Sequence, residues 1–239
     1  MVLCLPLLAA PLASQSPPAT SRPTVAVLYF TNSALVRRES YEPLSKGIAD
    51  MLITDLVVNP AIRVVERDQL QKILEELNLN ATGTVDKETA LRLGKVLGAH
   101  HMLTGVFFVD PKETMRIDVR SVNVETSEVE YVESVRGKAE NALDLISELA
   151  KKVNSGLHLP PMPTRTASAD GSPAAESHVT PADRYRAFFL VSRSIDEQDK
   201  KNLPQAIALL HQALQIDPTY THAQTRLASL ERGGASDNR

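Results

Sequence analysis

Two adjacent histidines, His100 and His101, are the residues whose types could most readily hold a metal ion. They stand at the start of an expected strand, where neighbouring side chains point to opposite faces, so they cannot readily share one ion. No third ligand is evident nearby. We therefore interpret them as two polar residues at a strand start, and predict no metal site and no cofactor.

The patterns for nucleophilic or phosphate chemistry are incomplete. The sequence has no Gly-x-Ser-x-Gly, the turn that presents a nucleophilic serine. The tripeptide Ser45-Lys46-Gly47 lacks the upstream glycine of a phosphate-binding loop, and Gly94 and Gly98 belong to an expected helix and its end. We predict a protein that is not an enzyme and that binds through surfaces. An enzyme whose site is assembled from scattered residues is the less favoured alternative.

Composition excludes several classes of partner. The chain of 239 residues carries a formal charge of −3, which gives no electrostatic signature for nucleic acid. Aromatic residues make up 4% and Trp is absent, so the core must consist of Leu, Val, Ile and Ala. No apolar run approaches the roughly 20 residues of a transmembrane helix. We expect neither nucleic-acid binding nor a membrane-spanning helix.

The first sixteen residues are uncharged and mostly apolar or small. Residues 1–16 are therefore interpreted as the hydrophobic part of a secretory signal, with the true translation start upstream because the usual basic beginning is missing. The alternative is an apolar tail without structure. The only cysteine, Cys4, follows Leu3 rather than a small residue, so we do not expect a lipid anchor there.

Periodicity between residues 24 and 157 predicts an α/β domain with a mixed sheet covered by helices, in the order β-α-β-α-α-β-β-β-α. Asp86 is the expected N-cap, and Gly98 the expected end, of one helix. The expected strands span 24–31, 62–66, 101–109, 114–124 and 129–135, and the expected helices span 42–58, 67–78, 87–97 and 140–156.

The rest of the chain divides into a linker and a helical hairpin. Residues 158–181 are rich in Pro, Ser and Ala and have almost no apolar side chains to bury, which is typical of a linker. Residues 182–231 predict a small all-α hairpin, because 204–218 resembles the second helix and exit of a tetratricopeptide (TPR) repeat. Its first helix departs from the repeat, since it carries the charged run 196–201. One repeat cannot bury its own apolar face, so the hairpin must pack on the main domain, pair with another copy, or be marginally ordered.

Residues 24–156 resemble the curli production assembly/transport (CsgG-type) family. The passages that carry the resemblance are Val25–Val27, Val65–Leu70, Ile73–Glu76, Ala90 and Leu93–Ala99. The resemblance implies an α/β domain with a mixed sheet and a protein of the bacterial cell envelope.

The resemblance also implies a second candidate function, that of the family's secretion channel. In that channel, protomers form a ring in the outer membrane. Here the loop 31–42 is short, and Tyr41 is its only aromatic residue. The apolar face of strand 114–124 runs only from Met115 to Val119, roughly 13 Å against an apolar band of about 25 Å. We therefore favour an exported periplasmic adaptor, which could also associate with the outer membrane. The alternative is a channel subunit for curli-like fibres.

The adaptor hypothesis needs a partner-binding element, and the hairpin is the expected one. The partners are expected to be proteins of the cell envelope, and a homo-oligomer is left open. The predicted partner-binding residues are Leu210, Ala213, Leu214 and Tyr220.

Overall fold

The computed structural model describes residues 22–79, 86–162 and 179–236. The first part of the chain forms β1 (Thr24–Val27), β2 (Thr31–Asn32), α1 (Arg38–Tyr41), α2 (Leu44–Val57), β3 (Arg63–Val64), α3 (Arg67–Glu76) and α4 (Lys87–Leu97). The remainder forms β4 (His101–Val109), β5 (Thr114–Asn123), β6 (Val129–Lys138), the 3-10 turn η1 (Ala139–Asn141), α5 (Ala142–Gly156), α6 (Pro181–Asp199), α7 (Leu203–Ile216) and α8 (Thr221–Ser236).

One mixed, six-stranded sheet organises the α/β domain. The strands lie in the order β3-β1-β4-β5-β6, with β2 also paired to β4. The short strands β1, β2 and β3 run parallel to their neighbours, while β4, β5 and β6 form an antiparallel meander. The predicted fold class, a mixed sheet covered by helices, is confirmed.

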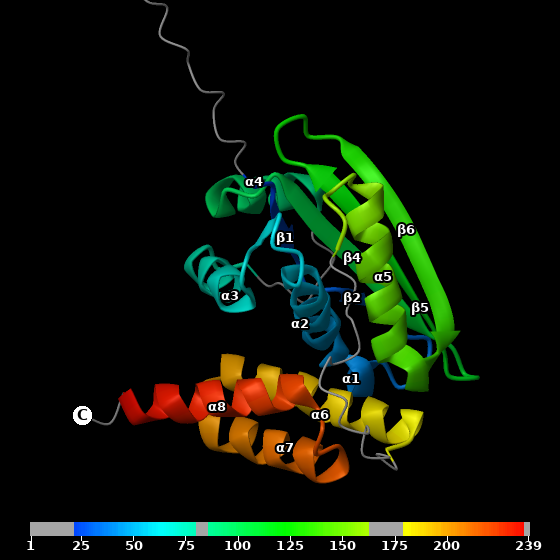
Figure 1. Ribbon diagram of the computed structural model, residues 1–239, viewed down its shortest axis with the longest axis vertical. Helices are drawn as coiled ribbons and strands as arrows, with labels where there is room; N and C mark the ends of the chain where they lie inside the picture. Colours follow the sequence, from blue (N-terminus) through cyan, green and yellow to red (C-terminus); the bar gives the residue numbers. More distant parts are fainter. Residues whose placement is uncertain (1–21, 80–85, 163–178, 237–239) are drawn as a thin grey trace, which may run out of the picture.

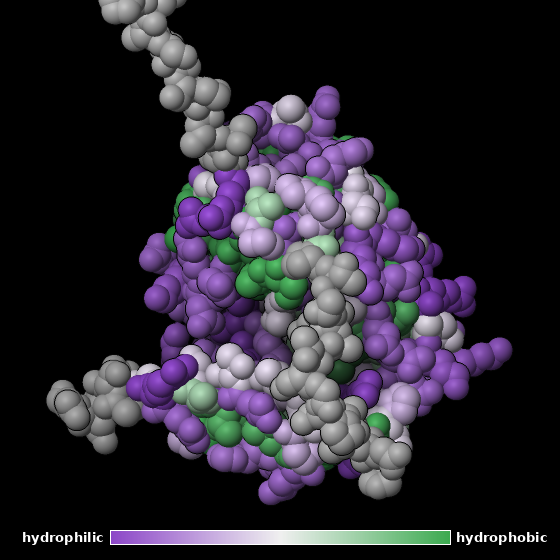
Figure 2. Space-filling view, in the orientation of Figure 1, coloured by the Kyte–Doolittle hydropathy of each residue, from purple (hydrophilic) through white to green (hydrophobic). Residues whose placement is uncertain are grey.

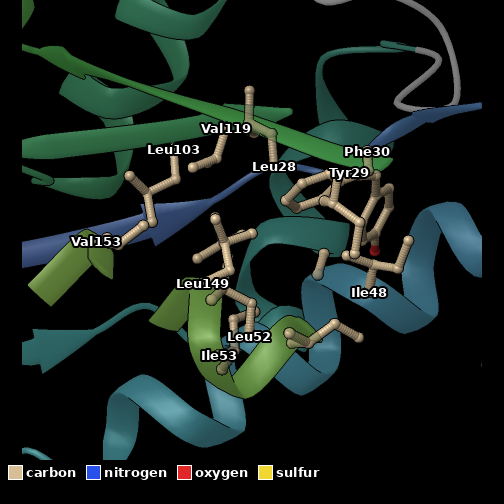
Figure 3. Packing of buried hydrophobic residues seen from close by; sticks show 14 of the residues in the cluster. Leu28, Tyr29, Phe30, Ile48, Leu52, Ile53, Leu103, Val119, Leu149 and Val153 are labelled. Atoms are coloured by element: carbon tan, nitrogen blue, oxygen red, sulfur yellow. The ribbon is translucent and has the colours of Figure 1, made fainter. Parts of the chain in front are cut away.

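The main core lies between the sheet and helices α2 and α5. Figure 3 shows Leu52 of α2 beside Leu149 of α5, beneath Leu103 of β4 and Leu28, which follows β1, and all four are buried. Helices α6, α7 and α8 form a separate layer against the far side of α2 (Figure 1). Helix α2 is therefore buried on two faces, between the core and this layer.

Local sequence explains the helix ends. The carboxylate of Asp86 accepts a hydrogen bond from the Thr89 backbone N–H, and Gly98 adopts the left-handed conformation that ends α4, so both predictions are confirmed. Helix α6 begins with a reciprocal capping box between Thr180 and Asp183, with Pro181 in its first turn.

Besides shifts of a few residues at element ends, the structure differs from the predicted elements at two places. The strand expected over 24–31 is divided into β1 and β2, because its pairing with β4 shifts by one residue between Val27, opposite Leu103, and Thr31, opposite Val106, while residues 25–30 remain buried. The short helix α1 was not predicted. It begins after Arg37, which has φ 47°, within a segment interpreted as a loop.

The residues just after α5, at the start of the predicted linker, still pack on the α/β domain. Leu159 is buried, and the Pro160 carbonyl accepts hydrogen bonds from the side-chain amides of Asn59 and Asn154 (2.7 and 3.0 Å). The predicted signal segment 1–16, with Cys4, and most of the predicted linker lie outside the described residues.

The apolar face of β5 is the core face of the sheet. Met115, Ile117 and Val119 are each at most 1% exposed. In the described part of the chain, no helix is both long and apolar enough to cross a membrane.

Candidate functional site

The predicted partner-binding residues lie in a second apolar cluster, among α6, α7 and α8. Leu210 and Ala213 are fully buried there, and Leu214 is partly buried beside them. Tyr220 joins both clusters: its hydroxyl donates to the Met51 Sδ on α2 (3.3 Å), and burial raises the pKa of the phenol. The structure thus brings the four residues together. Their role in partner binding stays a prediction, since a partner could reach Leu210 only by displacing a neighbouring helix.

A buried ionic clamp joins the three C-terminal helices to the α/β domain, and sequence reasoning missed it. We define the clamp by seven ionisable residues. They are Lys46, Asp50, Arg67, Asp196, Asp199, His222 and Arg226.

The first half of the clamp holds α6. Lys46 Nζ lies 2.8 Å from Asp196 Oδ1 and 2.9 Å from Asp199 Oδ2, and Asp199 Oδ1 lies 2.9 Å from Arg67 Nη1. Arg67 also donates to the Tyr29 hydroxyl (3.0 Å), so the pair is anchored in the core. The Lys46 and Arg67 side chains are 11% and 5% exposed, which means that these charges depend on each other rather than on water.

The second half of the clamp holds α8. Asp50 Oδ2 lies 2.6 Å from His222 Nε2, and Asp50 Oδ1 accepts from Arg226 Nη1 (3.1 Å). Burial alone would raise the pKa of Asp50, but Arg226, followed by His222, outweighs burial and holds that pKa below its ordinary value. Asp50 is therefore a buried anion shared by two partners from α8.

The packing of α6 on α2 is close because of Gly47. A Cβ atom at this position would lie 1.9 Å from Ser192 Oγ, and Ser192 is fully buried. Glycine thus lets the two helices approach and brings the charges on either side of it into contact.

Thr54, His222 and Asp50 form a chain of polar groups that superficially resembles a catalytic relay. Thr54 Oγ1 lies 3.4 Å from His222 Nδ1, whose other nitrogen contacts Asp50. The Thr54 hydroxyl, however, donates to the Asp50 backbone carbonyl (2.9 Å), and Arg226 already neutralises the carboxylate. A general base must be free to take the proton of its nucleophile, so this geometry favours a structural role.

A cleft of about 620 Å³ opens beside the clamp, between α2 and α3 on one side and α8 on the other. Figure 2 shows the hollow lined mainly by hydrophilic residues. Its floor includes Asp50, Arg67 and Arg226, which are committed to one another or to α6. We therefore interpret the cleft as the solvent-exposed side of the clamp.

The histidine pair is divided between two partners. His100 Nδ1 accepts a hydrogen bond from the Thr24 backbone N–H (3.0 Å). His101, at the start of β4, places its Nδ1 2.6 Å from the Glu130 carboxylate of β6. Across the described ranges, no three His, Cys, Asp or Glu side chains are placed to hold one metal ion.

Two signals in the sequence could have revealed the clamp. Lys46, Asp50 and Thr54 recur every four residues on a mostly apolar helix, which places a polar stripe on one face. The charged run 196–201, noted as a departure from the TPR pattern, contains the two aspartates that meet Lys46.

Comparison with known families gives one match for this chain. Residues 9–108 match the family described as "Curli production assembly/transport component CsgG". The predicted CsgG-type resemblance is confirmed. The matched residues include Lys46, Asp50 and Arg67 of the clamp, whereas the helices that they hold lie beyond the match.

Solved structures with similarity to the chain share little sequence with it. The LpoB C-terminal domain from Salmonella enterica is 16% identical with a TM-score of 0.36, covering 51% of this chain and 86% of that one. LpoB of E. coli, solved by NMR, is 14% identical with a TM-score of 0.40 (58% and 82% covered). The PelC dodecamer from Paraburkholderia phytofirmans is 16% identical with a TM-score of 0.36 (61% and 95% covered). No curated protein matches the sequence.

Proposed function

We propose that this protein is a non-enzymatic assembly component of the cell envelope, which acts as a periplasmic adaptor through protein–protein contacts. The observation that carries the proposal is the clamp. It fixes a helical module, α6 to α8, onto a domain of an assembly and transport family. A rigidly mounted module with exposed positions on α7 suits an adaptor, because it presents a second surface in a defined orientation.

The charges in the described site support binding rather than catalysis. Lys46, Asp50, Arg67 and Asp199 are each paired with at least one oppositely charged group. A reactive centre would instead hold a group poised to exchange a proton or attack a substrate.

The channel subunit remains the second candidate because it is the family's secretion role. Against it stands the core position of the β5 apolar face, where Met115, Ile117 and Val119 are covered by this chain's own side chains. Lipid cannot contact these side chains without opening the core.

Fractionation of the native host tests the location and the adaptor role together. We expect the protein to be released from the periplasm without detergent. A photo-crosslinking residue at the exposed Gln205 on α7 should capture a protein partner, whereas the same residue at the exposed Lys95 on α4 serves as the control. Recovery as a detergent-requiring ring in the outer membrane would replace the adaptor with the channel.

A further inference from the structure

The antiparallel part of the sheet has one face covered by α5, and a second face that α4 covers only at its Met102 end and that is open along the rest of β5 and β6. Helix α5 packs on the covered face, where the Tyr131 hydroxyl donates to the Lys152 carbonyl (2.9 Å). The alternate side chains of β5 and β6 point away from α5. Among them Arg116, Arg120 and Arg136 are exposed, and Val132 is 67% exposed. Figure 1 shows α5 on one side of these strands and no helix along the outer side of β6.

Strand register places the open-face residues in rows across the sheet. Arg120 is opposite Val132, Asp118 is opposite Ser134, and Arg116 is opposite Arg136. On the other side of β5, Val106 of β4 is opposite Asp118. The open face thus presents three arginines and one carboxylate around exposed valine, in a chain whose net charge is −3.

Two of the three arginines are uncompensated within the described chain. Arg116 Nε donates to Asp118 Oδ1 (2.7 Å), whereas no hydrogen bond or ion pair joins Arg120 or Arg136 to a described residue. The field of Arg136 reaches Asp110, whose carboxylate is already held by the backbone N–H groups of Lys112 and Thr114. Positive charge therefore remains available on this face.

Strand register places Arg136 directly opposite Arg116, and Asp118 neutralises only one of these two guanidinium groups. Like charges directly opposite each other on neighbouring strands destabilise a sheet. An anion placed between the two guanidinium groups would convert this repulsion into attraction, because a guanidinium fork binds carboxylates in a bidentate manner. The arrangement has the character of a binding surface that costs folding stability.

We propose that the open face of β4, β5 and β6 docks an acidic segment of a protein partner. The arginines would pair with its carboxylates, while Val106 and Val132 beside the shallow hollow of about 420 Å³ would contact its apolar side chains. An acidic protein segment fits better than a lipid surface, because strand register fixes the guanidinium groups at set positions beside apolar side chains, with Arg120 opposite Val132. This inference rests on the proposed adaptor function and names the chemistry of one partner.

Binding of a defined probe tests the surface. The probe is a fluorescein-labelled peptide of repeating Glu-Val pairs, and its counterpart is a peptide of repeating Lys-Val pairs, both measured by fluorescence anisotropy with the full chain. Arg136→Glu should raise the Kd for the acidic peptide about tenfold or more, mainly through a slower on-rate at low salt. Arg63→Glu is the matched control, since it makes the same charge change on β3 at the opposite edge of the sheet.

Folding stability gives a second readout, because a general change in net charge would not produce the local stabilisation expected at Arg136. Arg136→Thr removes the repulsion and places a good strand former in β6, so Tm should rise by about 1–4 °C while acidic-peptide binding falls. Arg120 lies opposite Val132 rather than opposite a cation. Arg120→Thr should therefore weaken acidic-peptide binding without raising Tm.

Several results would overturn the inference. One is that Arg63→Glu weakens acidic-peptide binding as much as Arg136→Glu does. Another is that the acidic and basic peptides bind equally well. A third is that Arg136→Thr lowers Tm. Binding to phosphatidylglycerol vesicles without binding to the acidic peptide would assign the face to a membrane surface instead. None of these results would alter the expected release from the periplasm, so failure of this inference is distinguishable from failure of the adaptor proposal.

Discussion

Helix α2 has two buried faces that are stabilised in different ways. One face carries Leu44, Ile48, Leu52 and Leu56 into the core beneath the sheet, and the other carries Lys46 and Asp50 into the clamp. The apolar face gains stability from any dry neighbour of suitable shape, because the hydrophobic effect has no direction. The clamp face requires particular partners at particular distances, and an incomplete clamp is worse than none. The comparison shows that one helix can pack by shape on one face and by charge on the other.

The largest expected effect comes from removing the anion at the centre of the clamp. Asp50→Ala leaves Arg226 and His222 facing a buried site without a counter-charge. We expect the free energy of unfolding to fall by about 3–5 kcal/mol. Urea unfolding gives the total, and hydrogen exchange should show α8 losing protection before α5. Leu52→Ala is the comparison, with a cost of about 2–5 kcal/mol that should instead appear throughout the α/β domain. Uniform loss of protection in both variants would remove the distinction between the two faces.

The substitution Gly47→Ala should change stability in opposite directions in the full chain and in the isolated domain. In the full chain, Gly47→Ala overlaps Ser192 and should destabilise by about 1–3 kcal/mol. In a truncated chain, residues 24–162, the neighbouring helix is absent, so the better helix propensity of Ala should stabilise by up to about 1 kcal/mol.

The truncation ends at residue 162 because Leu159 and Pro160 pack on the domain. We expect it to remain folded, since water can hydrate Lys46 and Asp50 once the helices are gone. Thermal melts of the four proteins check both expectations. An unfolded truncation would show that the C-terminal helices, with the buried Phe188, belong to the core.

Acid should loosen the clamp before it loosens the core. The pKa of Asp50 is lowered in the folded state, and so is that of Asp196, where Lys200 and Lys46 outweigh burial. A carboxyl with a lowered folded pKa contributes stability above its ordinary value of about 3.9, and that contribution disappears as pH falls through the folded value. Hydrogen exchange below about pH 4 should therefore show α6 and α8 opening while α5 stays protected. The leucine face should show no such dependence, and simultaneous opening of α5 would contradict the prediction.

The smallest effect is expected at the exposed margin of the same interface. Glu75 of α3 lies 3.7 Å from Lys201, and both side chains are well exposed. Solvent screens such pairs, so Glu75→Ala should leave the urea midpoint unchanged within error. A shift as large as that of Asp50→Ala would mean that exposure does not separate the strong ion pairs from the weak ones.

Local patterns along the chain are enough to predict most of the helices and strands and the buried face of each. Alternation along 114–124 and the leucine spacing of α2 depend only on neighbours in the chain, as does the cap at Asp86. For this reason the mixed sheet, the family resemblance and most boundaries could be predicted. The same logic failed for the split between β1 and β2, where pairing with β4 rather than local pattern decides which residues are strand.

Only the tertiary structure decided which polar residues meet. Lys46 and Asp196 are 150 positions apart, and Asp50 and Arg226 are 176 apart, so no local pattern links them. On the sequence alone, a polar stripe on a helix and a charged run on another are each typical of solvated faces. Close approach at Gly47 buries both at once, and burial is what turns ordinary surface charges into partners that depend on one another. The open arginine face follows the same rule, because only strand register places Arg116 opposite Arg136.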